Sequence, residues 1–206
     1  MSEDRKSHWE QLYATKEHTA VSWYEPKPDK SLELIRATGV LPTAPILDVG
    51  GGASTLVDHL MDDGFVDITI LDIAASAFSQ ARKRLGKNAD NATWIECDVS
   101  KFEPSRPYTI WHDRAVFHFL TDAIDRERYL SVLRKTLQPN GHFLLATFGP
   151  EGPLRCSGLE IRRYSVERLQ DLLGSDFKLY AHEIDEHCTP TGSTQQFLYS
   201  CWTLAG

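Results

Sequence analysis

The sequence lacks the long apolar runs that membrane-spanning proteins need. No hydrophobic stretch approaches the roughly 20 residues of a transmembrane helix. No apolar segment follows the charged first residues, as one would in a signal peptide. Hydrophobic residues make up 41% and charged residues 25% of the 206 positions, which is typical of one soluble globular domain. These features predict a cytoplasmic protein without a membrane partner.

Blocks of basic residues are also lacking. The longest is Arg82-Lys83-Arg84, and 29 acidic against 22 basic residues give a net charge of −7. Proteins that bind nucleic acids by neutralising phosphates need clustered positive charge. We therefore expect no nucleic-acid partner, and both a monomer and a homodimer remain open.

Cysteines are few and far apart, and no C-x-x-C pair occurs. The four are Cys97, Cys156, Cys188 and Cys201. This pattern predicts free thiols in a reducing compartment rather than a disulfide framework. The closest histidine groups, His112 with His118 and His182 with His187, do not match the ligand spacing of zinc sites, so no metal is expected.

From Pro45 onward, short apolar segments alternate with segments of helical spacing. Strands are expected at 46–49, 67–72, 92–96, 108–112 and 142–148, and helices at 55–61, 74–85 and 126–137. This alternation is typical of right-handed βαβ units. Two later β-like runs have no helix between them and can pair only antiparallel. The predicted fold class is α/β, a Rossmann-like, doubly wound, mostly parallel seven-stranded sheet with an antiparallel C-terminal hairpin.

Three strand ends carry residues that suit a nucleoside cofactor. Asp48-Val-Gly-Gly-Gly joins the first strand to a helix, and glycines there let a ligand approach the backbone. Asp72 ends the second strand 22 residues after Gly50, where a carboxylate accepts ribose hydroxyls in dinucleotide-type folds. Asp98 follows the third strand, where it can meet an adenine amino group. The alternative is three ordinary turns with helix-capping aspartates.

The acidic residue before the glycine turn helps to decide which kind of cofactor the site suits. A nicotinamide dinucleotide site approaches a pyrophosphate through G-x-G-x-x-G, whereas Thr55 stands here in place of the last glycine. The carboxylate of Asp48 would repel a pyrophosphate but can receive an ammonium group. A nicotinamide-dependent oxidoreductase is therefore disfavoured.

Residues 40–148 resemble the class I methyltransferases that use S-adenosylmethionine, in which D/E-x-G-x-G ends a strand and opens a helix. The resemblance implies S-adenosylmethionine as the cofactor. The implied cofactor-binding residues are Asp48, Gly50, Gly51 and Gly52 along the methionine part, Asp72 at the ribose, and Ile73, Asp98 and Val99 around the adenine. Trp23 is expected to cover the site, because Trp-containing N-terminal segments close the cofactor pocket in similar families. Ser54 stands where many members have a third glycine, and it is small enough to fit.

The segment after the fourth strand, Trp111-His112-Asp113-Arg114-Ala115, resembles thiopurine methyltransferases and small lysine methyltransferases. The resemblance implies a place for Arg114 beside the substrate; the alternative is a buried structural pair of Asp113 and Arg114. The candidate bases are His118, His112 and Asp113. Residues 149–164 are expected to form another wall, and their arginines suggest an anionic or carboxylate-bearing substrate group.

The predicted organisation is a single methyltransferase domain over residues 1–206. Residues 1–40 form an N-terminal helical cap with a flap around Pro26 and Pro28, 41–148 the cofactor-binding core, and 149–206 the substrate loop and hairpin.

The expected activity is methyl transfer from S-adenosylmethionine to a heteroatom nucleophile of a small molecule. One alternative is a protein lysine N-methyltransferase, because His8-Trp9-Glu10-x-x-Tyr13 resembles the entry segment of small lysine methyltransferases. Another is a non-catalytic cofactor-binding partner subunit.

Overall fold

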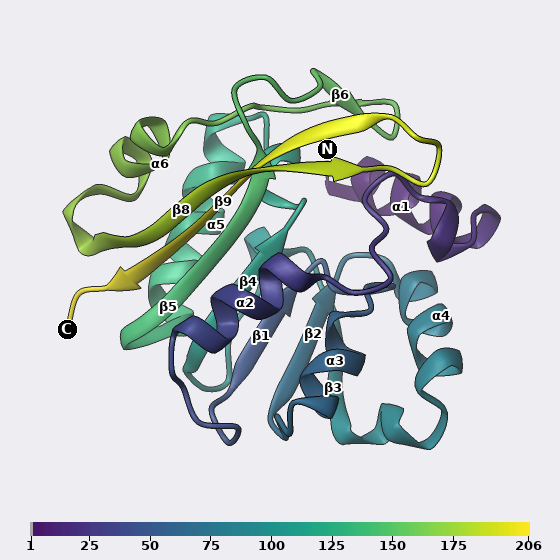
Figure 1. The fold of residues 1–206 in the computed structure, drawn as a ribbon, viewed down its shortest axis with the longest axis horizontal. Helices are drawn as coiled ribbons and strands as arrows, with labels where there is room; N and C mark the ends of the chain where they lie inside the picture. The colour runs from purple at the N-terminus through teal and green to yellow at the C-terminus, as the bar shows by residue number, and fades with distance from the viewer. Residues whose placement is uncertain (1) are drawn as a thin grey trace.

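The computed structural model describes residues 2–206, and its centre is a seven-stranded sheet of order β3-β2-β1-β4-β5-β9-β8 (Figure 1). The sheet strands are β1 (Ile46–Val49), β2 (Ile68–Asp72), β3 (Ala92–Glu96), β4 (Tyr108–Arg114), β5 (Leu137–Phe148), β8 (Phe177–Cys188) and β9 (Thr194–Leu204). The α-helices are α1 (Ser2–Thr15), α2 (Asp29–Ala37), α3 (Leu56–Asp62), α4 (Ala75–Leu85), α5 (Ala123–Thr136) and α6 (Val166–Leu173). A short pair, β6 (Arg155–Cys156) and β7 (Leu159–Glu160), lies apart from the sheet.

The strand directions confirm the predicted fold class. Strands β1 to β5 pair in parallel, whereas β9 is antiparallel to both of its neighbours, β5 and β8. Because β8 opposes β9, it runs in the same direction as β1 to β5. The strand order reverses between β1 and β4, which is the topological switch point where open α/β sheets bind ligands.

Alternation along the strands assigns each side chain to one of two helical layers. Ile46 packs in a core with residues of α2, α3 and α4, and the next residue, Leu47, packs with α5 and α6 on the other face. The same period sends His112 of β4 towards α2 and Asp113 towards α5, where their hydrogen-bond partners lie. Neighbouring polar residues of one strand therefore serve different faces.

Several predicted boundaries differ from the structure; the helix predicted from 126, for example, begins at Ala123. Strand β4 continues to Arg114 and so includes Asp113. Strand β5 begins at Leu137, before the predicted turn at 139–141; the turn is accommodated inside the strand, where the register with β4 shifts and Asn140 has a φ of 61°. An irregularity of this kind keeps the pairing while inserting extra residues.

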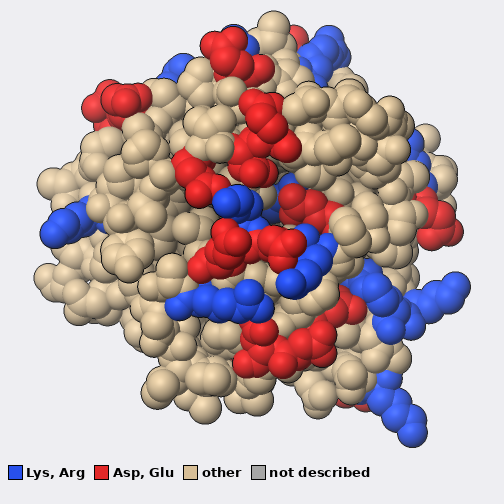
Figure 2. All heavy atoms as spheres, viewed as in Figure 1, with Lys and Arg blue, Asp and Glu red and all other residues tan. Residues whose placement is uncertain are grey.

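The surface is mixed in charge over α2 and β8. Figure 2 shows acidic and basic side chains interspersed on this face, and Lys30 lies within 3.4 Å of Glu33 and 2.6 Å of Glu183. Among the residues that the structure describes, no helix is both long and apolar enough to span a lipid bilayer.

Candidate active site

The carboxyl ends of strands β1 to β4 border an open cavity, named here the first cavity. A second cavity is lined in part by residues 21–28, named here the flap. The two cavities share Tyr13, Trp23, Val49, Gly50 and Arg114. Their position at the switch point makes them the candidate active site.

Most of the predicted site residues border one of these cavities. Those lining the first are Trp23, Gly50, Asp72, Ile73, Asp98, Val99 and Arg114. Those lining the second are Trp23, Asp48, Gly50, Gly51, His112 and Arg114. Gly52, Asp113 and His118 are not among the lining residues of either cavity.

The turn between β1 and α3 requires glycine. Gly50 has a φ of 71°, and a β-carbon there would lie 2.1 Å from Cγ2 of Val116. A β-carbon on Gly51 would lie 2.1 Å from Oδ2 of Asp48. Ser54 fits without a clash, and its hydroxyl accepts a backbone N–H from the start of α3 at 3.1 Å. The turn therefore leaves bare backbone beside both cavities.

Asp72 holds the adjacent turn as well as facing the first cavity. One of its carboxylate oxygens accepts the Gly52 N–H at 3.1 Å, and the other accepts the Ala74 N–H at 2.9 Å. Burial raises the pKa of this carboxyl to about 6. Asp72 can therefore cap the turn and also contact a ligand in the first cavity.

Asp98 combines the same two positions at the end of β3. Its Oδ1 accepts the backbone N–H and the hydroxyl of Ser100, at 2.9 and 2.8 Å. Its Oδ2 lies 3.5 Å from the guanidinium of Arg5, which is also 2.9 Å from a carboxylate oxygen of Asp125. Arg5 thus joins α1 to the rim of the first cavity.

Asp48 and His112 are paired neighbours on β1 and β4. His112 Nδ1 lies 2.7 Å from Oδ1 of Asp48, and His112 Nε2 lies 2.9 Å from the hydroxyl of Ser31 on α2. Both nitrogens of His112 are therefore engaged inside the protein. Oδ2 of Asp48 is buried and has no hydrogen-bond partner.

Asp113 is buried on the opposite face of β4. It accepts the hydroxyl of Tyr129 at 2.7 Å and the backbone N–H groups of Val116 and Phe117, at 3.0 and 3.3 Å. Burial raises the pKa of Asp113 to about 6. Asp113 and Arg114 do not pair with each other, because successive side chains of a strand point to opposite faces.

His118 lies inside the core behind the first cavity. Its ring stacks on Phe148 with centroids 4.5 Å apart, and its Nδ1 accepts the Phe148 N–H at 3.4 Å. Burial, assisted by the charge of Arg114, lowers the pKa of His118 to about 3. The imidazole is therefore neutral at physiological pH.

Arg114, whose side chain is 10% exposed, holds the flap against β4. It donates to the Trp23 carbonyl at 2.7 Å and to the Tyr199 hydroxyl at 2.9 Å, and it forms an ion pair with Glu25 at 2.9 Å. Its guanidinium also lies 4.9 Å from the ring centre of Phe197. These contacts fix Trp23 at the boundary between the two cavities.

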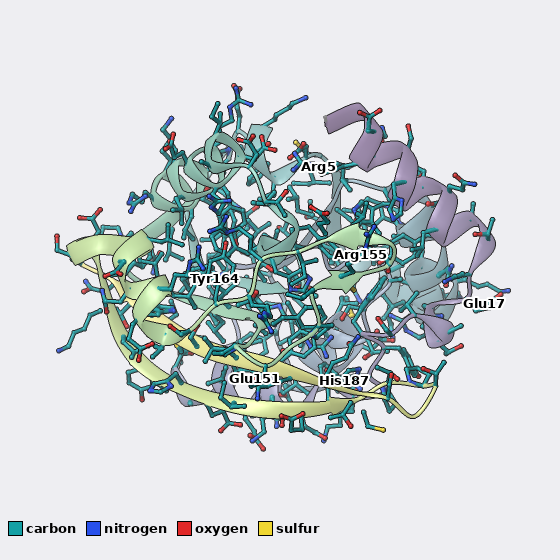
Figure 3. The ribbon with its side chains drawn as sticks, turned by 90° about the horizontal axis from the view of Figure 1, so that it is seen from above. Arg5, Glu17, Glu151, Arg155, Tyr164 and His187 are labelled. Carbon is teal, nitrogen blue, oxygen red and sulfur yellow. The ribbon has the colours of Figure 1, made fainter. Side chains whose placement is uncertain are left out.

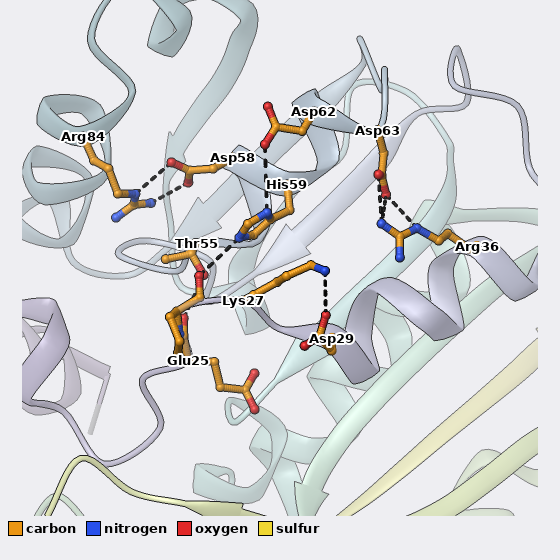
Figure 4. A network of polar contacts seen from close by, with 11 residues as sticks. Glu25, Lys27, Asp29, Arg36, Thr55, Asp58, His59, Asp62, Asp63 and Arg84 are labelled. Carbon is orange, nitrogen blue, oxygen red and sulfur yellow. Dashed lines mark hydrogen bonds and ion pairs between the residues drawn. The ribbon is translucent and has the colours of Figure 1, made fainter.

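The flap is also fastened to α3 (Figure 4). The Thr55 hydroxyl donates to the Glu25 carbonyl at 2.9 Å, and His59 Nε2 lies 3.2 Å from the Pro26 carbonyl. The predicted ordered loop is thus tied to Arg114 of β4 through Trp23 and Glu25, and to Thr55 and His59 at α3 and the residue before it.

Sequence reasoning missed how much of the site α1 supplies. Trp9 and Tyr13 line the first cavity, and the Trp9 ring meets those of Phe119 and Trp23 edge to face, at 5.0 and 5.7 Å. Glu10 positions α1 by accepting two backbone N–H groups at the start of α4, at 2.8 and 3.1 Å. The helical spacing of Trp9 and Tyr13 was the available signal, but it does not identify the surface against which they pack.

The connection 149–164 does not line either cavity, so the predicted wall is wrong for these cavities. Figure 3, seen from above, shows Arg155 and Tyr164 on this segment as it crosses the sheet. Arg155 donates to the Gly158 carbonyl at 2.7 Å, and Arg163 to the Gly152 carbonyl at 3.2 Å. Both arginines therefore stabilise their own loop.

Residues 4–206 contain no cluster of three or more His, Cys, Asp or Glu side chains that could hold a metal ion. The four cysteines are free thiols. His187 is buried and bonded to the flap, with Nε2 2.7 Å from the Ser22 carbonyl, whereas His182 is exposed.

Comparisons with known proteins agree with this geometry. A family described as "Methyltransferase domain" matches residues 47–143, from β1 into β5. The eEF1A lysine and N-terminal methyltransferase of Mus musculus is 24% identical over 180 residues, which cover 80% of this chain and 25% of the relative. The chain thus spans about a quarter of the length of the curated relatives that it matches.

Two solved structures share the fold. One comes from work on the conversion of a disulfide bond into a thioacetal group during echinomycin biosynthesis; it has a TM-score of 0.78 and 15% identity, covering 98% of this chain and 93% of that one. The other is the glycopeptide N-methyltransferase MtfA complexed with S-adenosyl-L-homocysteine, with a TM-score of 0.67 and 18% identity, covering 94% of this chain and 95% of that one.

The fold, the glycine turn at the switch point and the family match point to one class of protein. Residues 47–143 match the methyltransferase-domain family, and the sheet with its flanking helices has the Rossmann-like methyltransferase fold. These findings support the class I methyltransferase superfamily and S-adenosylmethionine as the cofactor.

Proposed function

We propose that this protein is an S-adenosylmethionine-dependent methyltransferase that acts on a nitrogen or sulfur atom of a small molecule, and that the acceptor is held in the aromatic part of the first cavity. The observation that carries the proposal is the cluster of Trp9, Trp23 and Phe119, whose rings meet edge to face beside the switch point. Aromatic walls hold an apolar or weakly polar acceptor with little loss of conformational entropy.

We further propose that the cofactor spans both cavities. Its ribose would lie at Asp72, its adenine between Ile73 and Asp98, and its methionine part beside Asp48. Two features support this placement: the bare backbone of the glycine turn between the cavities, and the buried, unpartnered Oδ2 of Asp48, which suits an ammonium group. When bound, S-adenosylmethionine supplies a methyl group carried on a positively charged sulfur.

The acceptor should arrive with a free lone pair, because the described cavity offers it no free base. Asp72 and Asp98 are bonded to backbone N–H groups, and burial raises the pKa of Tyr13 far above its usual value. Burial also raises the pKa of Cys97. A thiolate or an uncharged amine meets this condition, since neither needs a base at the moment of transfer.

Catalysis would then depend on orientation. The contribution of these side chains is to align the acceptor with the methyl carbon and to exclude water, an effect worth roughly 7–11 kcal/mol in well-oriented systems. Fixing Trp23 through Arg114 serves this alignment directly.

The second candidate is a protein amine acceptor. The curated relatives are named as lysine and N-terminal methyltransferases, and Trp9, part of the segment that resembles small lysine methyltransferases, lines the first cavity. An uncharged lysine or N-terminal amine also satisfies the requirement for a free lone pair.

One experiment separates the two candidates. A cell lysate is incubated with the purified protein and S-adenosylmethionine labelled on its methyl group, with a heat-inactivated sample as control. Label in the low-molecular-weight fraction alone is the expected result. Label in discrete protein bands would replace the small-molecule proposal with the protein proposal.

Cofactor affinity should fall in acid because of Asp72. Its pKa is about 6 in the free protein, and ribose hydroxyl donors would favour the ionised form and so lower that pKa on binding. The dissociation constant for S-adenosylhomocysteine should therefore be constant above about pH 7. It should rise below about pH 6, approaching tenfold per pH unit. Calorimetric titrations between pH 5 and pH 8 measure it.

The Asp72→Asn variant tests whether the pH dependence of cofactor affinity comes from Asp72. Asp113 has a similarly raised pKa but does not line the cavities, so both carboxyls titrate in the same range. The variant should bind more weakly at every pH and show a flat profile. A profile as steep as that of the natural protein would assign the titration to another group.

A further inference from the structure

Asp48, His112 and Ser31 form a buried chain of hydrogen bonds across three elements. The chain runs from the end of β1 through β4 to the first turn of α2, with contacts of 2.7 and 2.9 Å. All three residues are at least 96% buried. They also line the second cavity, so these hydrogen bonds run along the wall of a candidate ligand site.

The protons of this chain can be assigned from its chemistry. An ionised carboxylate only accepts hydrogen bonds, so His112 must donate from Nδ1 to Asp48. Nε2 faces the Ser31 hydroxyl, which can donate to it or accept from it. Both ring nitrogens are therefore engaged inside the protein, and neither is free to act as a base on a substrate.

The chain engages only one oxygen of the carboxylate. Oδ1 of Asp48 is held by His112, whereas Oδ2 is buried, has no hydrogen-bond partner and faces the position that a side chain on Gly51 would occupy. A buried carboxylate oxygen without a partner is costly, and a cationic donor removes that cost.

We propose that His112 and Ser31 are positioning residues that hold the Asp48 carboxylate for the ammonium group of the cofactor. By fixing Oδ1, they hold the carboxylate in one orientation at the wall of the second cavity, with Oδ2 unpartnered beside Gly51 in the free protein. The orientation is thus set before the ligand arrives, which lowers the cost of binding. The inference rests on the proposed placement of the methionine part beside Asp48.

Two ligands and two near-isosteric variants test the proposal. S-adenosylhomocysteine carries the ammonium group, and 5′-methylthioadenosine is the corresponding nucleoside thioether without the amino-acid end. His112→Leu removes both hydrogen bonds, whereas in His112→Asn the amide nitrogen takes the place of Nδ1 and keeps the donor to Asp48. Dissociation constants are measured by calorimetry on the whole protein.

His112→Leu should weaken S-adenosylhomocysteine binding about 10- to 100-fold, the range for loss of a hydrogen bond to a charged group. Binding of 5′-methylthioadenosine should change less than about threefold, because this ligand does not reach Asp48. His112→Asn should restore most of the affinity for S-adenosylhomocysteine. A merely structural role would weaken both ligands equally and would not be rescued by asparagine.

Ser31→Ala is a third variant, and it leaves β4 intact. It should weaken binding of S-adenosylhomocysteine about 2- to 10-fold and leave binding of 5′-methylthioadenosine unchanged. The proposal is overturned if both ligands bind equally more weakly to His112→Leu and to Ser31→Ala, or if neither ligand binds more weakly to these two variants.

Asp48→Asn shows which idea has failed. Suppose that it weakens binding of S-adenosylhomocysteine but not of 5′-methylthioadenosine, while the His112 and Ser31 variants do not. The positioning role of His112 and Ser31 is then wrong, and the placement of the methionine part stands. If Asp48→Asn also has no effect, the placement itself is wrong.

Discussion

Replacing Asp72 with alanine is expected to weaken S-adenosylhomocysteine binding about 100- to 10,000-fold. The estimate assumes that the carboxylate accepts two ribose hydroxyls, each roughly 1.5–3 kcal/mol as a hydrogen bond to a charged group. The substitution also frees the N–H groups of Gly52 and Ala74, so the glycine turn and the start of α4 lose a shared acceptor. Calorimetric titration at pH 7.5 measures the change, and circular dichroism reports whether the fold is kept.

Asp67 supplies the matched control, because it lies next to the other end of β2. It forms an ion pair with Arg106 at the surface, away from both cavities. Asp67→Ala should leave the dissociation constant unchanged within about twofold, since surface ion pairs contribute little. If Asp72→Ala binds as tightly as this control, the ribose does not lie at Asp72.

The strands around the cofactor cavity could be predicted because their signals are local. Short segments rich in apolar residues, each with a glycine or aspartate at its end or within the next two residues, locate β1, β2 and β3 with errors of at most one residue. The spacing of Asp72 from the glycine turn then follows from the length of a βαβ unit. The direction of β8 and the early start of β5 depend on pairing between distant segments, and a local pattern does not specify them.

The roles of the residues on β4 could not be assigned in the same way. His112 meets Asp48 only because β1 and β4 pair in one particular register, and a shift of one residue would turn His112 towards α5. Asp113 and His118 were candidate bases because they follow a strand end. Their environments differ from that of a surface turn, since both are at least 99% buried in the structure. Burial and register are properties of the assembled sheet.

The contribution of α1 to the first cavity also depends on a contact between residues far apart in the sequence. Glu10 caps α4 across 65 residues, and this contact brings Trp9 to the first cavity. The helix carries its aromatic residues on one face, so the sequence indicates that this face is covered. It does not indicate that part of this face lines a cavity where a ligand could bind.

Removing the charge of Arg114 is expected to have the largest effect on stability. Arg114→Met leaves Glu25 with only His187, whose Nδ1 lies 3.5 Å away, and removes the donors to the Trp23 carbonyl and the Tyr199 hydroxyl. Breaking a buried ion pair from one side costs about 3–5 kcal/mol, and this pair, which is only partly exposed, should lose up to that amount. The free energy of unfolding, measured by urea denaturation, should fall by this amount. Cofactor binding should also weaken, because the flap loses its tie to β4.

The double variant Arg114→Met with Glu25→Gln separates these two effects. Neutralising Glu25 removes the unpaired charge, so stability should recover by at least about 1 kcal/mol relative to Arg114→Met alone. Cofactor affinity should stay low, since the Trp23 carbonyl still lacks its donor and methionine cannot supply one. Additive losses of stability, within about 0.5 kcal/mol, would show that Arg114 and Glu25 are not coupled. Recovery of affinity together with stability would show that the charge pair, rather than the bond to Trp23, holds the flap over the cofactor.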